Sequence, residues 1–467
     1  MGIGEGGGEL AKQLLEKTYD IARPEIVLVY VHGKVKPGVG PHDVALALCK
    51  ETYANGFVKN RVMEFVGEGI YGLSQEYRNA IDVMTTETTC LSSIWETDEK
   101  TEQYFQQHGR DDAYRCLKVN DGTYYDRCID LDLSEVECMI ALPMHPSLAI
   151  PINTFKKDPK KYLKEAEEHA NAQLAHKNMD LVSKVKEDGT VIVNQGVIAG
   201  CSGGTYGNIM AASAILNDGD CGNGEFRLSI YPDSMPVYKA LVENGTVASL
   251  ISTGAIFREA FCGPCFGAGD TPANNELSIR HTTRNFPNRE GSKPNEGQIA
   301  SVCLMDARSI AATSRNQGVL TAASDVCHED EKDYMCPFDA SLYEKRVFNG
   351  YGKEDPDYPL HFGPNIKDWP EQPSLSSDIL LKIVSHIDDP VTTTDELIPS
   401  GETSSYRSNP LRLAEFTLSR RDPDYVNEAK KVKEMDWENE EVKHVYALLE
   451  NSGITVDPDT NIASSIY

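Results

Sequence analysis

What this sequence lacks excludes several classes of protein. Its 467 residues contain no stretch of about 18 consecutive apolar residues, so the sequence predicts no membrane-spanning helix. The first residues have neither the basic and apolar regions of a secretory signal nor the arginine-rich character of a transit peptide. Internal repeats and low-complexity tracts are absent as well. These absences predict a globular protein of the cytoplasm.

Positive charge is also scarce. The chain has 45 lysines and arginines against 72 aspartates and glutamates, which gives a formal net charge of -27. A surface this acidic repels phosphate groups, and this argues against nucleic acid as a partner. Solubility is the simplest role for the excess of acid.

Apolar residues make up 40% of the chain, and its length leaves room for about three domains. The largely β-branched run Ile26–Val31 is typical of a strand buried on both faces, and Val62–Val66 is a second short strand. Helical patterns alternate with these runs, as in the segments that begin at Pro41 and span 77–93. This alternation predicts a multi-domain α/β protein with three-layer domains.

Further elements are predicted along the chain. Asp158-Pro159 is a typical helix start, with Asp as the N-cap and Pro at the first helical position. Strands are predicted over 190–194 and 380–387, and a charged helical tail over 423–450.

Twelve cysteines in a chain without a secretory signal indicate a reducing compartment, where paired cysteines more often bind metal or do chemistry than form disulfides. One pair stands out, Cys262 and Cys265 in a Cys-Gly-Pro-Cys sequence. Guanidinium groups hold carboxylates or phosphates in bidentate geometry, so nearby arginines would add an anion site to the thiols. The positive residues that follow the pair are Arg280, His281, Arg284, Arg289 and Lys293.

Four interpretations of the cysteine pair are open from the residues alone. A zinc site needs two more ligands, and Cys327-His328 does not have a zinc-like spacing. A thioredoxin-like dithiol uses the same four letters, but here Phe261 precedes them. Two merely buried thiols would leave the arginines unexplained. The fourth interpretation is an iron–sulfur cluster with Cys201 as third ligand, because Cys201 lies at a glycine-rich strand-to-helix corner that favours a thiolate.

The fourth interpretation predicts a chemistry. Three cysteine ligands leave one iron of a cube-type cluster open, and an open metal site acts as a Lewis acid. Arg284 and Arg289 are suited to binding carboxylates. A Lewis acid on a hydroxyl, with arginines on acid groups, is equipped to add water to a hydroxy acid or to remove it.

The same residues resemble motifs of the aconitase family. The Cys262-Gly-Pro-Cys265-Phe-Gly sequence, followed by Arg284-Asn-Phe and then Arg289, is similar to the family's cysteine pair and its Arg-Asn-Phe-x-x-Arg substrate motif. Cys201 stands where the family places its first cluster cysteine.

Other parts of the chain extend the resemblance. Glu87, in Met84-Thr-Thr-Glu87, matches the family's active-site glutamate. Asp395 and Arg407 resemble the Asp and Arg that open its mobile C-terminal domain.

The resemblance implies an iron–sulfur-dependent hydro-lyase with a [4Fe-4S] cluster. Its substrate would be a hydroxy di- or tricarboxylic acid such as citrate or isocitrate, converted through an aconitate-like intermediate. The implied cluster ligands are Cys201, Cys262 and Cys265, the implied carboxylate-binding residues are Arg284, Arg289 and Arg407, and the implied catalytic acids are Glu87 and Asp395.

The sequence departs from the family pattern at three places. Ser202-Gly-Gly follows Cys201 where the family usually has Thr-Asn-Ser, Thr283 replaces an Asn, and two threonines precede Glu87 in place of Gly-Ala. These departures predict a divergent hydratase. The alternatives are a dehydratase of the isopropylmalate or homoaconitate type, and a non-catalytic protein that binds a cluster or senses iron.

Two family segments, Asp-Ser-His-Thr and the serine-bearing Gly-Ser-x-Arg-Glu, do not occur in this sequence. The resemblance therefore predicts a chain truncated at both ends, or one that a second chain completes. Its predicted parts are a remnant of a first domain (1–22), a second α/β domain (23–149), a third with the cluster cysteines (150–325), a linker (326–371) and an incomplete swivelling domain (372–467).

Overall fold

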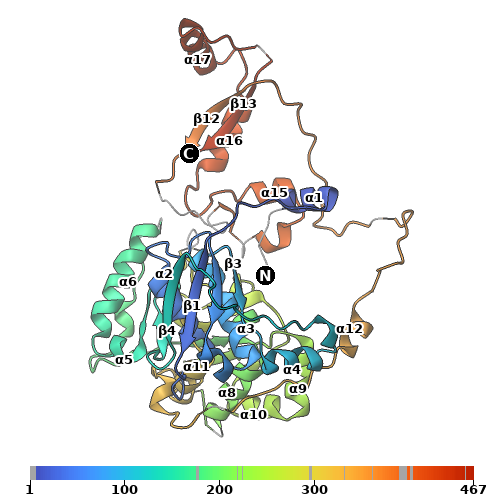
Figure 1. The fold of residues 1–467 in the computed structure, drawn as a ribbon. Coiled ribbons are helices and arrows are strands. Elements are labelled where there is room, and N and C mark those ends of the chain that lie inside the picture. Colours follow the sequence, from blue (N-terminus) through green and yellow to red (C-terminus); the bar gives the residue numbers. More distant parts are fainter. Residues whose placement is uncertain are drawn as a thin grey trace. The chain divides into compact units, whose positions relative to one another are not determined.

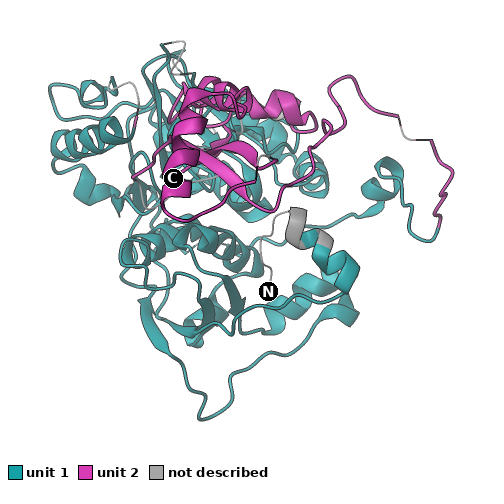
Figure 2. Ribbon diagram, turned by 90° about the horizontal axis from the view of Figure 1, so that it is seen from above, with its two compact units in different colours: residues 1–173, 177–352 teal, residues 174–176, 353–467 magenta. Residues whose placement is uncertain are grey.

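The computed structural model describes most of the chain and divides it into two compact units. Unit 1 comprises residues 1–173 and 177–352, and unit 2 comprises 174–176 and 353–467 (Figure 2). No helix in the described part of the chain is long and apolar enough to cross a membrane. The described residues are 7–174, 178–217, 219–222, 224–293, 297–330, 332–359, 361–388, 397–399, 403–457 and 459–467.

The first sheet of unit 1 has four parallel strands in the order β3 (Ser92–Trp95), β2 (Val62–Val66), β1 (Ile26–His32) and β4 (Arg127–Asp132) (Figure 1). The predicted strands at 26–31 and 62–66 are thus confirmed. The side chains of Val27, Val29 and Val31 are buried, as the apolar run requires. Helices α2 (Pro41–Thr52) and α3 (Gln75–Met84) pack against each other beside this sheet.

The second sheet has seven strands in the order β6-β5-β11-β10-β7-β8-β9. Strands β11, β10, β7, β8 and β9 are parallel, while β5 runs antiparallel to β11 and to β6. Its strands are β5 (Met139–Ala141), β6 (Ala149–Pro151), β7 (Gln195–Ile198), β8 (Arg227–Ile230), β9 (Ile256–Phe257), β10 (Glu276–His281) and β11 (Ala300–Met305).

Every residue of β11 is buried, as is typical of a parallel strand in the interior of a sheet. Helices α8 (Tyr206–Leu216) and α11 (Ala307–Arg315) also pack against each other. Parallel strands connected through helices confirm the predicted α/β fold class. The predicted boundary between residues 149 and 150 lies inside β6, and β5 and β6 both belong to the seven-stranded sheet.

Two predicted elements, one helix and one strand, are shorter in the structure than predicted. The helix predicted over 77–93 stops at Met84 and continues only as a 3-10 turn, Thr85–Thr88, before β3. The hydroxyls of Thr85 and Thr88 donate to the carbonyls of Asp82 and Thr85 and compete with the helical pattern. The strand predicted over 190–194 is reduced to isolated bridges at Val191 and Ile192, and β7 begins at Gln195.

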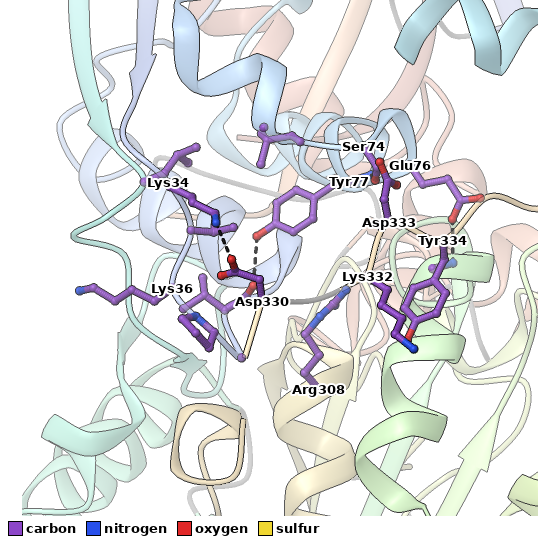
Figure 3. Close-up of a pocket in the computed structure, with 18 of the residues that line it drawn as sticks. Lys34, Lys36, Ser74, Glu76, Tyr77, Arg308, Asp330, Lys332, Asp333 and Tyr334 are labelled. Atoms are coloured by element: carbon purple, nitrogen blue, oxygen red, sulfur yellow. Dashed lines mark hydrogen bonds and ion pairs between the residues drawn. The ribbon is translucent and has the colours of Figure 1, made fainter. Parts of the chain in front are cut away.

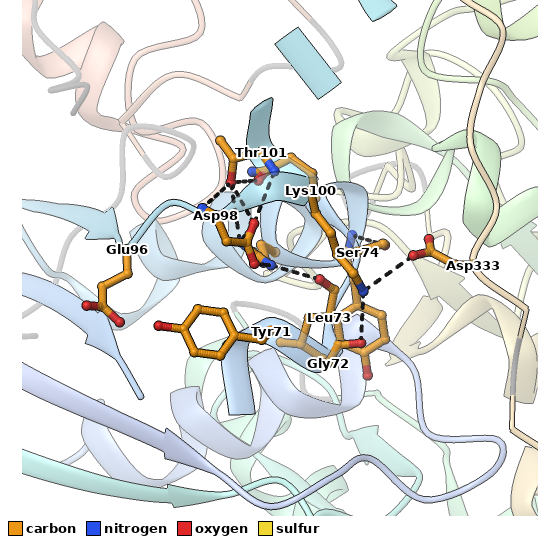
Figure 4. A network of polar contacts seen from close by, with 12 residues as sticks. Tyr71, Gly72, Leu73, Ser74, Glu96, Asp98, Lys100, Thr101 and Asp333 are labelled. Atoms are coloured by element: carbon orange, nitrogen blue, oxygen red, sulfur yellow. Dashed lines mark hydrogen bonds and ion pairs between the residues drawn. The ribbon is translucent and has the colours of Figure 1, made fainter. Parts of the chain in front are cut away.

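An ion pair between the buried Arg78 and the partly buried Asp98 joins α3 to the start of α4 (Glu99–Gln107). The guanidinium of Arg78 donates to the carboxylate of Asp98 and to the carbonyl of Leu73. Asp98 in turn accepts from the backbone N–H of Thr101 and caps α4 (Figure 4). Lys100 reaches from this helix to Asp333, at 3.4 Å.

The predicted helix start at Asp158-Pro159 is confirmed by α6, one of the remaining helices of unit 1, where Asp158 accepts from the backbone N–H of Lys161. These remaining helices are α1 (Gly7–Glu16), α5 (Ile152–Phe155), α6 (Pro159–Gln173), α7 (Gly200–Gly203), α9 (Met235–Glu243), α10 (Thr246–Ser252) and α12 (Ser341–Arg346).

Unit 2 is built on two parallel strands, β12 (Ile379–Ser385) and β13 (Asn461–Ile466), with α16 (Tyr425–Lys433) packed against both. The predicted strand at 380–387 is confirmed. The predicted helical tail is two helices, α16 and α17 (Glu440–Asn451), and α15 (Pro410–Ala414) precedes them.

Candidate functional site

The β7–α7 corner presents Cys201. Buried strand β7 ends at Ile198, and Gly200, with φ of +75°, turns the chain into α7, where Cys201 is the second residue. A Cβ on Gly200 would lie 2.8 Å from the sulfur of Cys265. Because only glycine leaves this space and tolerates this φ, the corner and the Cys262 loop can touch.

The second part of the site is the loop that carries Cys262 and Cys265. Its turn is closed by the N–H of Cys265, which donates to the carbonyl of Cys262 at 3.1 Å. Arg289 Nε donates to the carbonyl of Cys265 at 2.9 Å. The loop and the arginine motif are therefore joined directly, although 24 residues separate them.

The two thiols of this loop form a hydrogen bond with each other. This bond, with the positive charge of Arg289, lowers the pKa of Cys262 to about 6, although burial opposes the change. The same bond and burial raise the pKa of Cys265. Of the two thiols, Cys262 is therefore the more readily deprotonated, and the thiolate is the form that binds metal.

Cys201 completes a group of three thiols. Burial, and then the charge of Cys262, raise the pKa of Cys201, and Cys201 also acts on Cys265. Among the residues that the structure describes, no three His, Cys, Asp or Glu side chains are arranged as a ligand group for a metal ion. The donor set still fits a thiolate-bound cluster, because three thiols from two loops gather here, with Cys265 against Gly200.

Glu87 and Arg284 meet although they are 197 residues apart. Arg284 Nε donates to Glu87 Oε1 at 2.6 Å, from a side chain that is 35% exposed to one that is 4% exposed. Burial raises the pKa of Glu87, while the charges of Arg284 and Arg289 oppose this rise. Arg289 thus acts on both the thiol pair and the carboxylate, and links the two halves of the site.

The other two predicted site residues come from the C-terminal part of the chain. Arg407 is exposed and belongs to unit 2, after a short 3-10 turn. Asp395 lies outside the described residues. Their predicted roles therefore stay predictions.

A cavity of about 500 Å³ opens beside the cysteines. Cys201 and Cys262 line one part of it, and two acids that the sequence analysis did not single out, Glu76 and Asp233, line another. Burial, as the main cause, raises the pKa of Glu76 to about 7 and that of Asp233 to about 6. Of these two acids, only Asp233 could have been predicted from its position, because it follows the end of β8 just as Cys201 follows the end of β7.

A second cavity, of about 170 Å³, lies where α3 and α8 begin (Figure 3). Lys34 lines it and pairs with Asp330, and the hydroxyl of Tyr77 donates to the carbonyl of Val39. None of the predicted site residues lines this cavity. We therefore place the candidate site at the cysteines.

A family model described as the aconitase family (aconitate hydratase) matches residues 1–312. The chain belongs to the aconitase family. The matched residues include the three cysteines, Glu87, Arg284 and Arg289, although the match by itself assigns no role to any of them.

Relatives of this aconitase-family chain include large subunits of 3-isopropylmalate dehydratase. The one from Moorella thermoacetica is 29% identical over 324 residues, which are 69% of this chain and 67% of the relative. Those from Clostridium kluyveri and Roseiflexus castenholzii are 27% and 29% identical, over 65% and 62% of this chain. The chain spans between 62% and 67% of the length of these three relatives.

Proposed function

We propose that this chain is the cluster-bearing part of a hydro-lyase that adds water to, or removes it from, a hydroxy di- or tricarboxylic acid. One observation carries the proposal. Three thiols gather at the β7–α7 corner and the Cys262 loop, and Arg289 connects them to the Glu87–Arg284 pair. The nearness of three thiols, a carboxylate and two guanidinium groups in unit 1 supports this proposal.

In this proposal Cys201, Cys262 and Cys265 hold a [4Fe-4S] cluster. When bound, such a cluster supplies a Lewis acid at the iron that has no cysteine ligand. Arg289 faces the thiolates with a positive charge, which favours the deprotonated ligands.

In this proposal the arginines bind the substrate, and Glu87 donates a proton to it. Arg284, which is partly exposed, and Arg289 bind substrate carboxylates in bidentate geometry. Glu87 holds a proton at Oε1 or Oε2 more readily than an ordinary glutamate, because burial raises its pKa. It delivers that proton to the leaving oxygen. Arg407 and Asp395 are proposed to complete the substrate site.

The relatives support one substrate class. These relatives are named as large subunits of 3-isopropylmalate dehydratase, which favours a 2-hydroxy diacid of the isopropylmalate type over citrate or isocitrate. The words large subunit also support a second chain as partner. We propose a location in the cytoplasm, as the sequence analysis predicts.

The test is anaerobic reconstitution with iron and sulfide, read by visible absorption and by EPR after mild oxidation. We expect the wild-type chain and Cys128→Ser, a change at an exposed cysteine of β4, to take up a cluster, and Cys201→Ser to lose the EPR signal of a three-iron form. Dehydration of a 2-hydroxy diacid should then require iron. If the chain takes up a cluster but shows no turnover even when candidate partner chains are supplied, the non-catalytic alternative is favoured. If no variant takes up a cluster, the proposal is refuted.

A further inference from the structure

Arg280 is a buried cation behind the cysteine loop. It lies in β10, one residue before the strand ends, and its side chain is among the largest that are fully buried in the described part of the chain. The sequence analysis grouped Arg280 with the neighbouring positive residues as part of an anion site. Its side chain instead points into the protein, toward the backbone of the loop that carries Cys262 and Cys265.

The guanidinium of Arg280 makes four hydrogen bonds that join the sheet to this loop. Nε donates to Ser278 Oγ at 3.0 Å, and Nη2 donates to Gln195 Oε1 at 3.1 Å, on the adjacent strand β7. Nη1 donates to the carbonyl of Pro264 at 2.8 Å, and Nη2 donates to the carbonyl of Asp270 at 2.5 Å. Two of these bonds therefore attach the guanidinium to the sheet, and the other two attach it to the loop at separate points.

The positions of the two carbonyl groups that accept from Arg280 show which segment of the loop it holds. Pro264 lies between the two cysteines, and Asp270 lies five residues after Cys265. Asp270 is itself anchored, because its carboxylate accepts from Ser229 Oγ at 2.9 Å and from the hydroxyl of Tyr231. The segment from 264 to 270 is thus fixed at both ends, and the guanidinium spans the distance between them.

The charge of Arg280 also bears on the thiols. Burial, as the largest effect, lowers the pKa of Arg280, while the negative charges of Glu290, Asp270 and Cys265 oppose this change. A positive charge held in a low-dielectric interior acts strongly on its neighbours. Lysine would keep the charge, but its single ammonium lacks the planar fork that bonds four groups at once.

We propose that Arg280 is a positioning residue of the cluster site. It fixes the backbone of residues 262–270 so that Cys262 and Cys265 face Cys201, and its buried charge offsets the negative charge of bound thiolates. This inference rests on the proposed function for the cluster, although the role of Arg280 in holding the loop does not.

The experiment compares Arg280→Lys and Arg280→Gln with Arg227→Gln, a control on β8 of the same sheet, where Arg227 pairs with Glu276 at 2.7 Å. Amide hydrogen exchange of the full chain without iron is measured first. We expect exchange in 262–270 to rise about tenfold or more in both Arg280 variants, with β7 and β11 unchanged, because local opening reports local anchoring. Equal acceleration throughout the sheet, or no change in the loop, would overturn the inference.

Reconstitution supplies the second readout. We expect iron and sulfide per chain to fall to less than half of the wild-type amount in both variants, with the control unchanged. The reduction potential of the remaining cluster should fall in Arg280→Gln, which loses the charge, and stay near wild type in Arg280→Lys. Equal potentials in the two variants would overturn the electrostatic part. A wild-type chain that takes up no cluster would refute the proposed function, while hydrogen exchange would still decide whether Arg280 holds the loop.

Discussion

The seven-stranded sheet of unit 1 and the two-stranded sheet of unit 2 use similar apolar strands in opposite ways. All six residues of β11 are buried. In β12 the apolar side chains of Ile379, Leu381 and Ile383 are 45%, 56% and 56% exposed. An apolar run therefore predicts a strand, but whether that strand is buried depends on what packs against it.

The difference explains where the candidate site lies. Cys201, Asp233 and Arg284 each follow the end of a strand by three residues, and the strands β7, β8 and β10 that position them are almost entirely buried. Two parallel strands with a single helix against them supply much less support. The strongly shifted pKa values of Glu76 and Cys262 both belong to groups in unit 1.

The largest contrast is expected for matched leucines of the two sheets. Leu304 in β11 is fully buried, so Leu304→Ala should cost about 2–5 kcal/mol of unfolding free energy through lost burial and a cavity. Leu381→Ala in β12 should cost less than about 1 kcal/mol, because the side chain is already 56% exposed. Urea unfolding of both variants measures the difference, and equal costs would contradict the contrast between the sheets.

The second contrast between the two units is in how their carboxylates make the stability of the protein depend on pH. Burial, with smaller contributions from the charges of Asp233 and Asp333, raises the pKa of Glu76 in unit 1 to about 7, whereas the N–H of Gly207 opposes the rise. An unfolded chain releases this proton near pH 4.3, so between about pH 4.3 and 7 only the folded protein keeps it, and stability falls as the pH rises.

Glu76→Gln removes this fall. The variant should be more stable than the wild type by about 3 to 4 kcal/mol at pH 8 and equal to it near pH 4, because each unit of pKa shift corresponds to about 1.4 kcal/mol. The control is Glu450→Gln, at an exposed position of α17 in unit 2, which should leave the pH profile unchanged. Unfolding by urea at a series of pH values gives both profiles, and parallel profiles for Glu76→Gln and the wild type would refute the assignment.

The smallest contrast concerns ion pairs. Arg284→Gln leaves the buried Glu87 without its nearest cation and should cost about 1 kcal/mol, a value reduced because Arg284 is partly exposed. The same change in unit 2, Lys382→Gln, breaks an exposed pair with Glu441 and should cost less than about 0.5 kcal/mol. A double-mutant cycle with Glu87→Gln isolates the coupling, and no coupling would show that the contact does not stabilise the fold.

Several features were predictable because they depend on neighbours in the sequence. The runs at 26–31 and 62–66 alternate with helical patterns, and both became strands of a parallel sheet. The start of α6 follows from Asp158 and Pro159. The turn after Met84 was missed because hydroxyls of the threonines bond to backbone carbonyls, a competition that apolar periodicity does not show.

The sequence by itself determined the fold class, the cysteine pair and the likeness to one family, because strand and helix patterns and short motifs are local. Only the tertiary structure decided which positive residues face a ligand. Arg280 and Arg284 stand four residues apart in one basic run, yet one is buried under the cysteine loop and the other pairs with Glu87. Burial and charge pairing depend on residues brought together from distant parts of the chain, and no local pattern records them.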